Sequence, residues 1–215
     1  AVGYYFATDL PAKIGGVPIG LINCSWGSTR IQAWMSPDAL ADFPQVGASW
    51  EKLLKDLPER QSKYEKERAE YRAQAKAAKE RGEIFKKPFP KPPTGPGTRE
   101  APSGAFLGMV APLAPYAIRG ILWYQGEGNT GSAESYAKMF PRLIKDWRTV
   151  WNDTSLPFLF VQLPNYNLPS DRTGERWARL REAQMTALTL PHTGAAITID
   201  LGTPEDGHPP DKSGF

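Results

Sequence analysis

Four short segments of the chain are almost continuously apolar. Such runs are typical of strands that are buried on both faces of a sheet. Longer segments with helical spacing of their apolar residues alternate with them, and this alternation predicts an α/β fold with a parallel sheet covered by helices on both faces. The predicted strands are 17–25 ("VPIGLINCS"), 119–125, 157–163 and 194–200.

The helical segments carry recognisable start and stop signals. Ser36 is a good N-cap, and Pro37 suits the first position of the helix that follows it. Pro141 is expected to interrupt the longest amphipathic segment, because proline lacks the backbone N–H that a helix interior needs. The predicted helices are 1–15, 36–43, 132–151 and 172–190.

The middle of the chain has a different composition. Residues 51–85 are charged and helix-prone with little apolar face, and residues 86–104 are dense in Pro and Gly. We therefore predict one domain, 1–48 plus 104–215, interrupted by an insertion at 49–103. The insertion shows no catalytic pattern. We expect a solvated spacer there, with a helical arm over the site or a contact to an anionic surface as alternatives.

Charge and composition narrow the class of protein. Residues 51–100 hold 14 Lys/Arg and 9 Asp/Glu, a net charge of +5, whereas the other residues hold 12 and 14, a net charge of −2. The basic character therefore belongs to the insertion, which argues against nucleic acid as a partner of the body. The seven Trp are expected mainly to fill the core, and a sugar-binding surface is the other interpretation.

Cysteine and histidine are scarce. A single Cys, Cys24, excludes an intrachain disulfide, and two His, His192 and His208, exclude a multi-histidine zinc site. We therefore predict no metal and no cofactor. No apolar run approaches the roughly 20 residues that span a bilayer, so no membrane span is expected. The chain starts at Ala1, which is expected of a mature or excised segment.

Polar, glycine-bearing loops follow all four predicted strands, and these loops should meet at one edge of a parallel sheet. In the last loop, His208 stands beside Glu205 and Asp206. A histidine with a carboxylate partner is the general base of acyl-transfer enzymes, although a surface histidine beside solvated acids has the same pattern. His192 lies in "LPHTG" and is expected to be only a turn residue.

The stretch "WYQGEGNT" (123–130) supplies further candidates. Gln125, Asn129 and the backbone amide of Gly27 could donate hydrogen bonds to a developing oxyanion. Asn129 could instead cap the next helix. Glu127 could be a second carboxylate of the site, a substrate contact or a solvated acid. The chain has neither a phosphate-binding glycine loop nor a G-x-S-x-G elbow.

Four fragments together resemble the sialate O-acetylesterase family of SGNH hydrolases. These fragments are "GLINCSWGSTRIQAWMSPDAL", "GMVAPLAPYAIRGILWYQGEGNTGSAESYAKMFPRLIKDWR", "PFLFVQLPNYN" and "ITIDLGTPEDGHPPDK". The resemblance implies a flavodoxin-like three-layer α/β/α sandwich and hydrolysis of acetyl esters on carbohydrates. It implies a serine nucleophile, a histidine base and an acid, without metal. A secreted or periplasmic location rests on this resemblance alone.

The family's motifs fall on named positions of this chain. Its oxyanion glycine falls on Gly27, and its catalytic histidine falls on His208. The acid falls on Asp206, with Glu205 and Glu127 as competing assignments. The family's Gln-Gly-Glu-Ser-Asn block falls on 125–129, namely Gln125, Gly126, Glu127, Gly128 and Asn129, with Gly128 in place of the usual Ser.

The family's Gly-Gln-Ser-Asn block, which carries the nucleophile, has no counterpart in this sequence. The chain therefore resembles an internal piece of a longer protein, and we expect it to be inactive alone. Ser25 and Ser28 lie near Gly27 but on no nucleophile elbow. A catalytically dead carbohydrate-binding module is the alternative function, and a nucleic-acid-binding arm rests only on the basic insertion. The sequence does not decide which acetylated sugar is the substrate or what the oligomeric state is.

Overall fold

The computed structural model describes residues 1–171, 173–209 and 211–214. At its centre is a parallel sheet in the order β1–β2–β3. In the register, Ile121 pairs with Phe158, and Phe158 pairs with Thr193. The α/β fold class is thus confirmed, with strands shorter than predicted: β1 (Ile121–Trp123), β2 (Phe158–Val161) and β3 (Thr193–Ala196).

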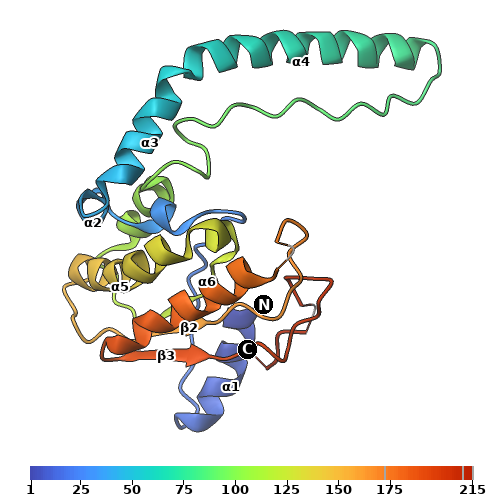
Figure 1. Cartoon of the computed structure of the whole chain (residues 1–215). Helices are drawn as coiled ribbons and strands as arrows, with labels where there is room; N and C mark the ends of the chain where they lie inside the picture. The colour runs from blue at the N-terminus through green and yellow to red at the C-terminus, as the bar shows by residue number, and fades with distance from the viewer. Residues whose placement is uncertain (172, 210, 215) are drawn as a thin grey trace.

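Helices α5 (Ala133–Val150) and α6 (Glu175–Met185) make the two crossovers between the parallel strands. Both cover the same face of the sheet (Figure 1). The opposite face is more open than predicted, since Leu122 and Leu159 are each 37% exposed there. Helix α1 (Val2–Lys13) lies on that side and buries none of its residues. Within the described residues the cover on this second face is thus thinner than that on the face of α5 and α6.

The core lies between the sheet and α5. The ring of Phe140 is fully buried and lies 6.0 Å from that of Trp123 and 5.1 Å from that of Phe160. Edge-to-face and offset contacts of this kind stabilise a core beyond the area that they bury. Four of the seven Trp are buried, which confirms the core-filling role for these four: Trp34, Trp123, Trp147 and Trp177.

The predicted strand at 17–25 is wrong. The segment is without regular structure, and among the described residues no backbone pairs with it. Val17, Leu21 and Ile22 are each at least half exposed. An apolar run becomes a strand only where a neighbouring backbone satisfies its N–H and C=O groups, and the sequence pattern of the run itself does not show whether one is present.

Pro141 does not interrupt its helix, contrary to the prediction, because α5 continues through it. Proline at this position leaves the carbonyl of Ala137, four residues earlier, without its helical donor. The hydroxyl of Thr186 donates to that oxygen at 3.0 Å. A side chain from another element thus replaces the lost hydrogen bond.

The start signal at Ser36 is confirmed. Its hydroxyl accepts from the amide of Ala39 at 3.0 Å and so caps α2 (Pro37–Ala41). The same hydroxyl donates to the buried carboxylate of Asp146 at 2.6 Å. The cap therefore also ties α2 to α5.

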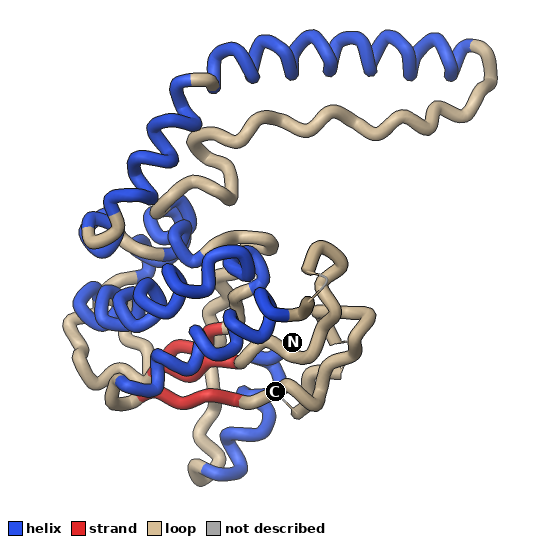
Figure 2. Tube along the Cα trace, in the orientation of Figure 1, coloured by secondary structure: helices blue, strands red, loops and turns tan. Residues whose placement is uncertain are grey.

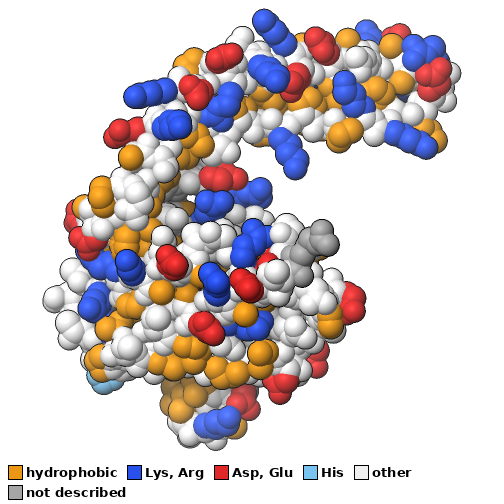
Figure 3. Space-filling model, in the orientation of Figure 1, with side chains coloured by type: hydrophobic (Ala, Val, Ile, Leu, Met, Phe, Trp, Pro, Cys, Tyr) orange, Lys and Arg blue, Asp and Glu red, His pale blue; other side chains and the backbone are white. Residues whose placement is uncertain are grey.

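The charged middle segment forms an arm that projects from the body (Figures 1 and 2). Helices α3 (Pro44–Lys55) and α4 (Leu57–Glu80) run outward, and an extended segment returns. Tyr71 packs against Phe85 and Phe89 with ring centroids 5.0 Å apart in both pairs, which joins the two sides of the arm. Acidic and basic side chains are interspersed on its outer surface (Figure 3).

Short 3₁₀ or π turns complete the described elements: η1 (Ile31–Trp34), η2 (Phe106–Val110), η3 (Ala111–Leu113), η4 (Glu127–Ser132) and η5 (Thr186–Thr189). Within the described ranges, none of the helices combines the length and the apolar character that crossing a membrane requires. The same residues contain no group of three or more His, Cys, Asp and Glu placed to hold a metal ion.

Candidate active site

Loops that follow the strands meet at the carboxyl edge of the sheet, as the sequence predicts. The amide of Asn167, after β2, donates to the carbonyl of Pro204, after β3. Gly207 lies against the ring of Tyr166, where a Cβ atom would come within 3.2 Å of the ring. These contacts join the loops after β2 and β3, and His208 of the last loop in turn lies within 4.0 Å of Glu127 in the turn that follows β1.

His208 lies between two carboxylates. Its Nε2 is 3.7 Å from Oε1 of Glu127, and its Nδ1 is 3.9 Å from Oδ1 of Asp206. The backbone amide of His208 donates to the same Asp206 oxygen at 2.7 Å, so this carboxylate also shapes the loop. The His208 side chain is 74% exposed. Three of the predicted residues thus converge within ion-pair distance, on the open surface of this edge.

Glu205, the third candidate acid, is exposed. Among the described residues it makes no ion pair with His208 within 4.0 Å. His192 lies at the amino edge of the sheet, just before β3, and adopts a positive φ of 55°. This agrees with its prediction as a turn residue.

The structure adds two residues that the sequence reasoning did not single out. The Lys212 ammonium donates to the carbonyl of Pro209 at 2.6 Å and lies 5.7 Å from the centroid of the Tyr124 ring. Burial, and then the charges of Glu127 and Asp206, raise the pKa of the Tyr124 hydroxyl. Burial lowers the pKa of Lys212, and the same two carboxylates oppose this. Tyr124 lies in the stretch "WYQGEGNT" and Lys212 lies in "DGHPPDK". Their position within these two motifs is the sequence feature from which they could have been predicted.

Gln125 and Asn129 are buried and form a hydrogen-bonded brace. Nε2 of Gln125 donates to the carbonyl of Thr29 at 3.1 Å and to Oδ1 of Asn129 at 3.0 Å. Oδ1 of Asn129 also accepts from the amide of Ile31 at 2.9 Å. Nδ2 of Asn129 donates to Oε1 of Gln32 at 3.2 Å. The brace therefore ties the turn after β1 to the loop at 29–32, and it occupies both amide hydrogens of Gln125.

Asn129 is not the cap of the next helix, which was the alternative. The N-cap of α5 is Ser132, and no side chain caps it. Gly126 is needed for packing, because a Cβ atom there would come within 3.1 Å of Leu163 and of Leu180. The carbonyl of Gln125 in turn accepts from the buried amide of Gln184 at 3.1 Å. The turn after β1 is thus fixed by hydrogen bonds to the loop at 29–32 on one side and to Gln184 of α6 on the other.

Gly27 lies on an exposed loop with open space around its Cα. Its N–H donates to no acceptor among the described residues. Nearby, Ser25 donates its hydroxyl to Oδ1 of Asn23, and Ser28 adopts a positive φ of 62°. Neither serine hydroxyl is hydrogen-bonded to the His208 ring.

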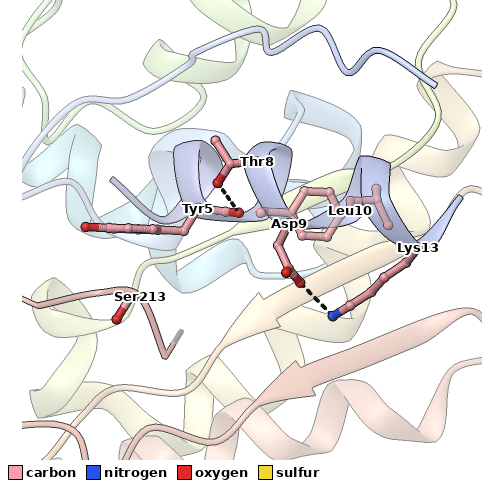
Figure 4. Close-up of a pocket in the computed structure, with 7 residues that line it drawn as sticks. Tyr5, Thr8, Asp9, Leu10, Lys13 and Ser213 are labelled. Carbon is pink, nitrogen blue, oxygen red and sulfur yellow. Dashed lines mark hydrogen bonds and ion pairs between the residues drawn. The ribbon is translucent and has the colours of Figure 1, made fainter. Parts of the chain in front are cut away.

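A pocket of about 480 Å³ lies beside this edge, between α1 and the end of the last loop (Figure 4). An ion pair of 2.6 Å between Lys13 and Asp9 crosses part of it. None of the residues that line the pocket belongs to the predicted site. They are Tyr5, Phe6, Thr8, Asp9, Leu10, Lys13 and Ser213.

Comparison with a solved structure defines the class of protein. The chain superposes on a carbohydrate acetylesterase from Xanthomonas citri with a TM-score of 0.69 and 33% identity, covering 99% of this chain and 37% of that one. The fold is therefore that of an SGNH-like α/β carbohydrate esterase.

Sequence comparisons narrow this class to a family. The profile described as carbohydrate esterase, sialic acid-specific acetylesterase, matches residues 107–213. Sialate O-acetylesterase of Rattus norvegicus is 31% identical over 199 residues, and that of Homo sapiens is 27% identical over 198. The matches cover 86% of this chain and 34% and 30% of these relatives. The chain thus matches the sialate O-acetylesterase family in its profile, its curated relatives and its fold, and it spans about a third of the length of the curated relatives it matches.

Proposed function

We propose that this chain contributes the histidine and the acid of a site that hydrolyses O-acetyl esters on carbohydrates. The family supports this reaction class. The single observation that carries the assignment is the position of His208, with Glu127 on one ring nitrogen and Asp206 on the other. Such a histidine takes a proton from a nucleophile and later returns it to the leaving group.

The two carboxylates suit different roles. Asp206 faces Nδ1 and also holds the backbone amide of His208, so it is placed to orient the ring and to stabilise its charged form. Glu127 faces Nε2, the nitrogen that meets a nucleophile when the acid occupies Nδ1. We therefore assign Asp206 as the orienting acid and Glu127 to the side of the nucleophile and substrate. Glu205 has no part in this arrangement.

The nucleophile in this proposal is a serine outside the described residues. Ser25 is engaged with Asn23, and no described hydroxyl is hydrogen-bonded to the His208 ring. The free N–H of Gly27 is the proposed oxyanion donor. Gln125, Gly126 and Asn129 then act by bracing the turn that carries Glu127, rather than by contacting the acetyl group.

The arm at 49–103 stands apart from this chemistry in the proposal, and the body is 1–48 plus 104–215. Helix α4 buries only one of its residues, Ala78, as a solvated spacer would. At its returning end the arm is tied to the loop at 29–32, where the amide of Ser103 donates to the carbonyl of Gln32 at 2.9 Å.

An activity assay on the isolated chain tests whether the nucleophile lies outside it. We expect it to hydrolyse p-nitrophenyl acetate no faster than its His208→Ala variant, because a base without a nucleophile gives little rate enhancement. The measurement is the initial rate of both proteins at equal concentration, with circular dichroism to show that both are folded. A clear rate that His208→Ala abolishes would place the nucleophile within these residues. A carbohydrate-binding module would bind acetylated glycans in this form and stay inactive in every longer form.

A further inference from the structure

His208 lies in a segment that has little regular structure to hold it. Apart from an isolated bridge between Thr203 and Asp206, the described residues after β3 form neither a helix nor a strand. The His208 side chain is 74% exposed, so packing around the ring does not fix it either. Its place between two carboxylates thus depends on the side chains that hold the loop.

The Lys212 side chain closes the turn that follows His208. Its ammonium reaches back to the carbonyl of Pro209, the residue next to His208, and donates to it at 2.6 Å. A hydrogen bond from a charged donor is shorter and roughly twice as strong as one between neutral groups. Lys212 therefore anchors the loop at the residue adjacent to the proposed base.

The same ammonium joins the loop to the end of β1. It lies 5.7 Å from the centroid of the Tyr124 ring, within the range of a cation–π interaction. Tyr124 directly follows β1 and packs against the hydrophobic core. Through Lys212, the loop after β3 is thus connected to the turn that carries Glu127.

Lys212 also brings a positive charge to the two acids of the site. Burial lowers the pKa of Lys212, and the charges of Asp206 and Glu127 oppose this lowering. The ammonium is therefore within electrostatic reach of both carboxylates that flank His208. Two carboxylates on one histidine repel each other, and a nearby cation reduces that repulsion.

We propose that Lys212 is a positioning residue, which holds His208 between its two carboxylates by joining the loop to Tyr124. The proposal rests on the proposed function and adds to it a residue that acts through His208 rather than on the substrate. A neutral side chain of similar length would leave the Pro209 carbonyl and the Tyr124 ring without the cation. The loop would then lose this connection to β1.

NMR spectroscopy of the isolated chain tests this without requiring turnover. The chain has only two histidines, so the His208 ring protons are readily assigned, and His192, just before β3, reports on the fold. Because Nε2 of His208 is 3.7 Å from the Glu127 carboxylate, the wild-type chain should show nuclear Overhauser contacts between the His208 ring and the Glu127 methylene groups. We expect Lys212→Met to lose these contacts while the His192 signals stay unchanged.

Matched variants separate the cation from the side-chain stem. Lys212→Arg should keep the contacts, because a guanidinium is also charged, donates hydrogen bonds and lies well on an aromatic face. Lys212→Gln removes the cation but leaves a polar side chain, and it should lose the contacts as Lys212→Met does, so the test does not depend on the folding of one variant. Lys145→Met is the control, because Lys145 is exposed on α5, and it should keep the contacts.

Turnover by a longer form of the protein gives a second readout. In a form that hydrolyses acetyl esters, Lys212→Met should lower kcat roughly tenfold and leave KM within about twofold, since a misplaced base slows the chemical step rather than the binding of the sugar. Lys212→Arg should restore most of kcat. A rise in KM alone would assign Lys212 to sugar binding and overturn the proposal.

The results in the isolated chain separate this proposal from the proposed function. Contacts that persist in both Lys212→Met and Lys212→Gln would overturn the proposal and leave the proposed function standing. A loss in Lys212→Arg as severe as in Lys212→Met would contradict a role for the cation. Contacts that are absent already from the wild-type chain would show that His208 is not held beside Glu127, and would count against the proposed function as well.

Discussion

Replacing Phe140 with alanine is expected to lower the free energy of unfolding by about 4 kcal/mol, the usual cost of emptying a fully buried aromatic site. Its ring contacts rings from both β1 and β2, at 6.0 Å from Phe158 as well as from Trp123. The surrounding rings are large and cannot collapse into the space. Urea unfolding followed by tryptophan fluorescence gives the value.

The matched control is Phe89→Ala on the arm. Phe89 is 50% exposed, so its removal should cost less than about 1.5 kcal/mol. Similar losses for the two variants would contradict a core centred on α5 and the sheet.

Asn129→Ala has the second largest expected effect, about 3 kcal/mol, because it leaves two buried donors unpaired. These are the amide of Ile31 and one of the two N–H groups of Gln125 Nε2, whose other N–H still donates to the carbonyl of Thr29. Asn129 is 1% exposed, so water does not replace the lost acceptor. The measurement is again urea unfolding, and loss of binding of acetylated sugars should accompany the loss of stability because the turn carries Glu127.

Asn167→Ala is the control for this variant. Asn167 is exposed and its side chain makes no hydrogen bond with the described residues. Its replacement should change stability by less than about 0.5 kcal/mol. If Asn129→Ala were equally harmless, the brace between the turn and the loop at 29–32 would not hold the site together.

The sequence pattern predicted the elements whose apolar residues are buried against each other. Strands β1 to β3 and helices α5 and α6 were found because crossovers in a parallel sheet leave a clear alternation. The capping role of Ser36 was also readable, since it depends on the residues just after it.

Features that depend on residues far away in the chain could not be predicted from the local sequence pattern. The run at 17–25 looks like a strand, yet strand formation needs a neighbouring backbone. The tolerance of Pro141 depends on Thr186, which is 45 positions further along the chain. In both cases the deciding hydrogen bond is a tertiary contact, and local periodicity does not contain it.

In the candidate site, too, some features follow from the local sequence and others depend on tertiary contacts. His208, Asp206 and Glu127 were found from residue type and their position after strands, and the structure brings them together. The amides of Gln125 and Asn129 were expected to face an oxyanion, and in place of that prediction we propose that they brace the turn. Their burial and mutual hydrogen bonds depend on the loop at 29–32, which lies almost a hundred residues earlier.

The most direct test of the account is to find the serine that His208 activates. The protein from its natural source, and a recombinant form carrying His208→Ala, would be treated with a fluorophosphonate that labels activated serines, and the labelled peptide would be mapped by mass spectrometry. The account predicts a labelled serine outside these 215 residues and loss of labelling in His208→Ala. Label on Ser25 or Ser28, or unchanged labelling without His208, would contradict it.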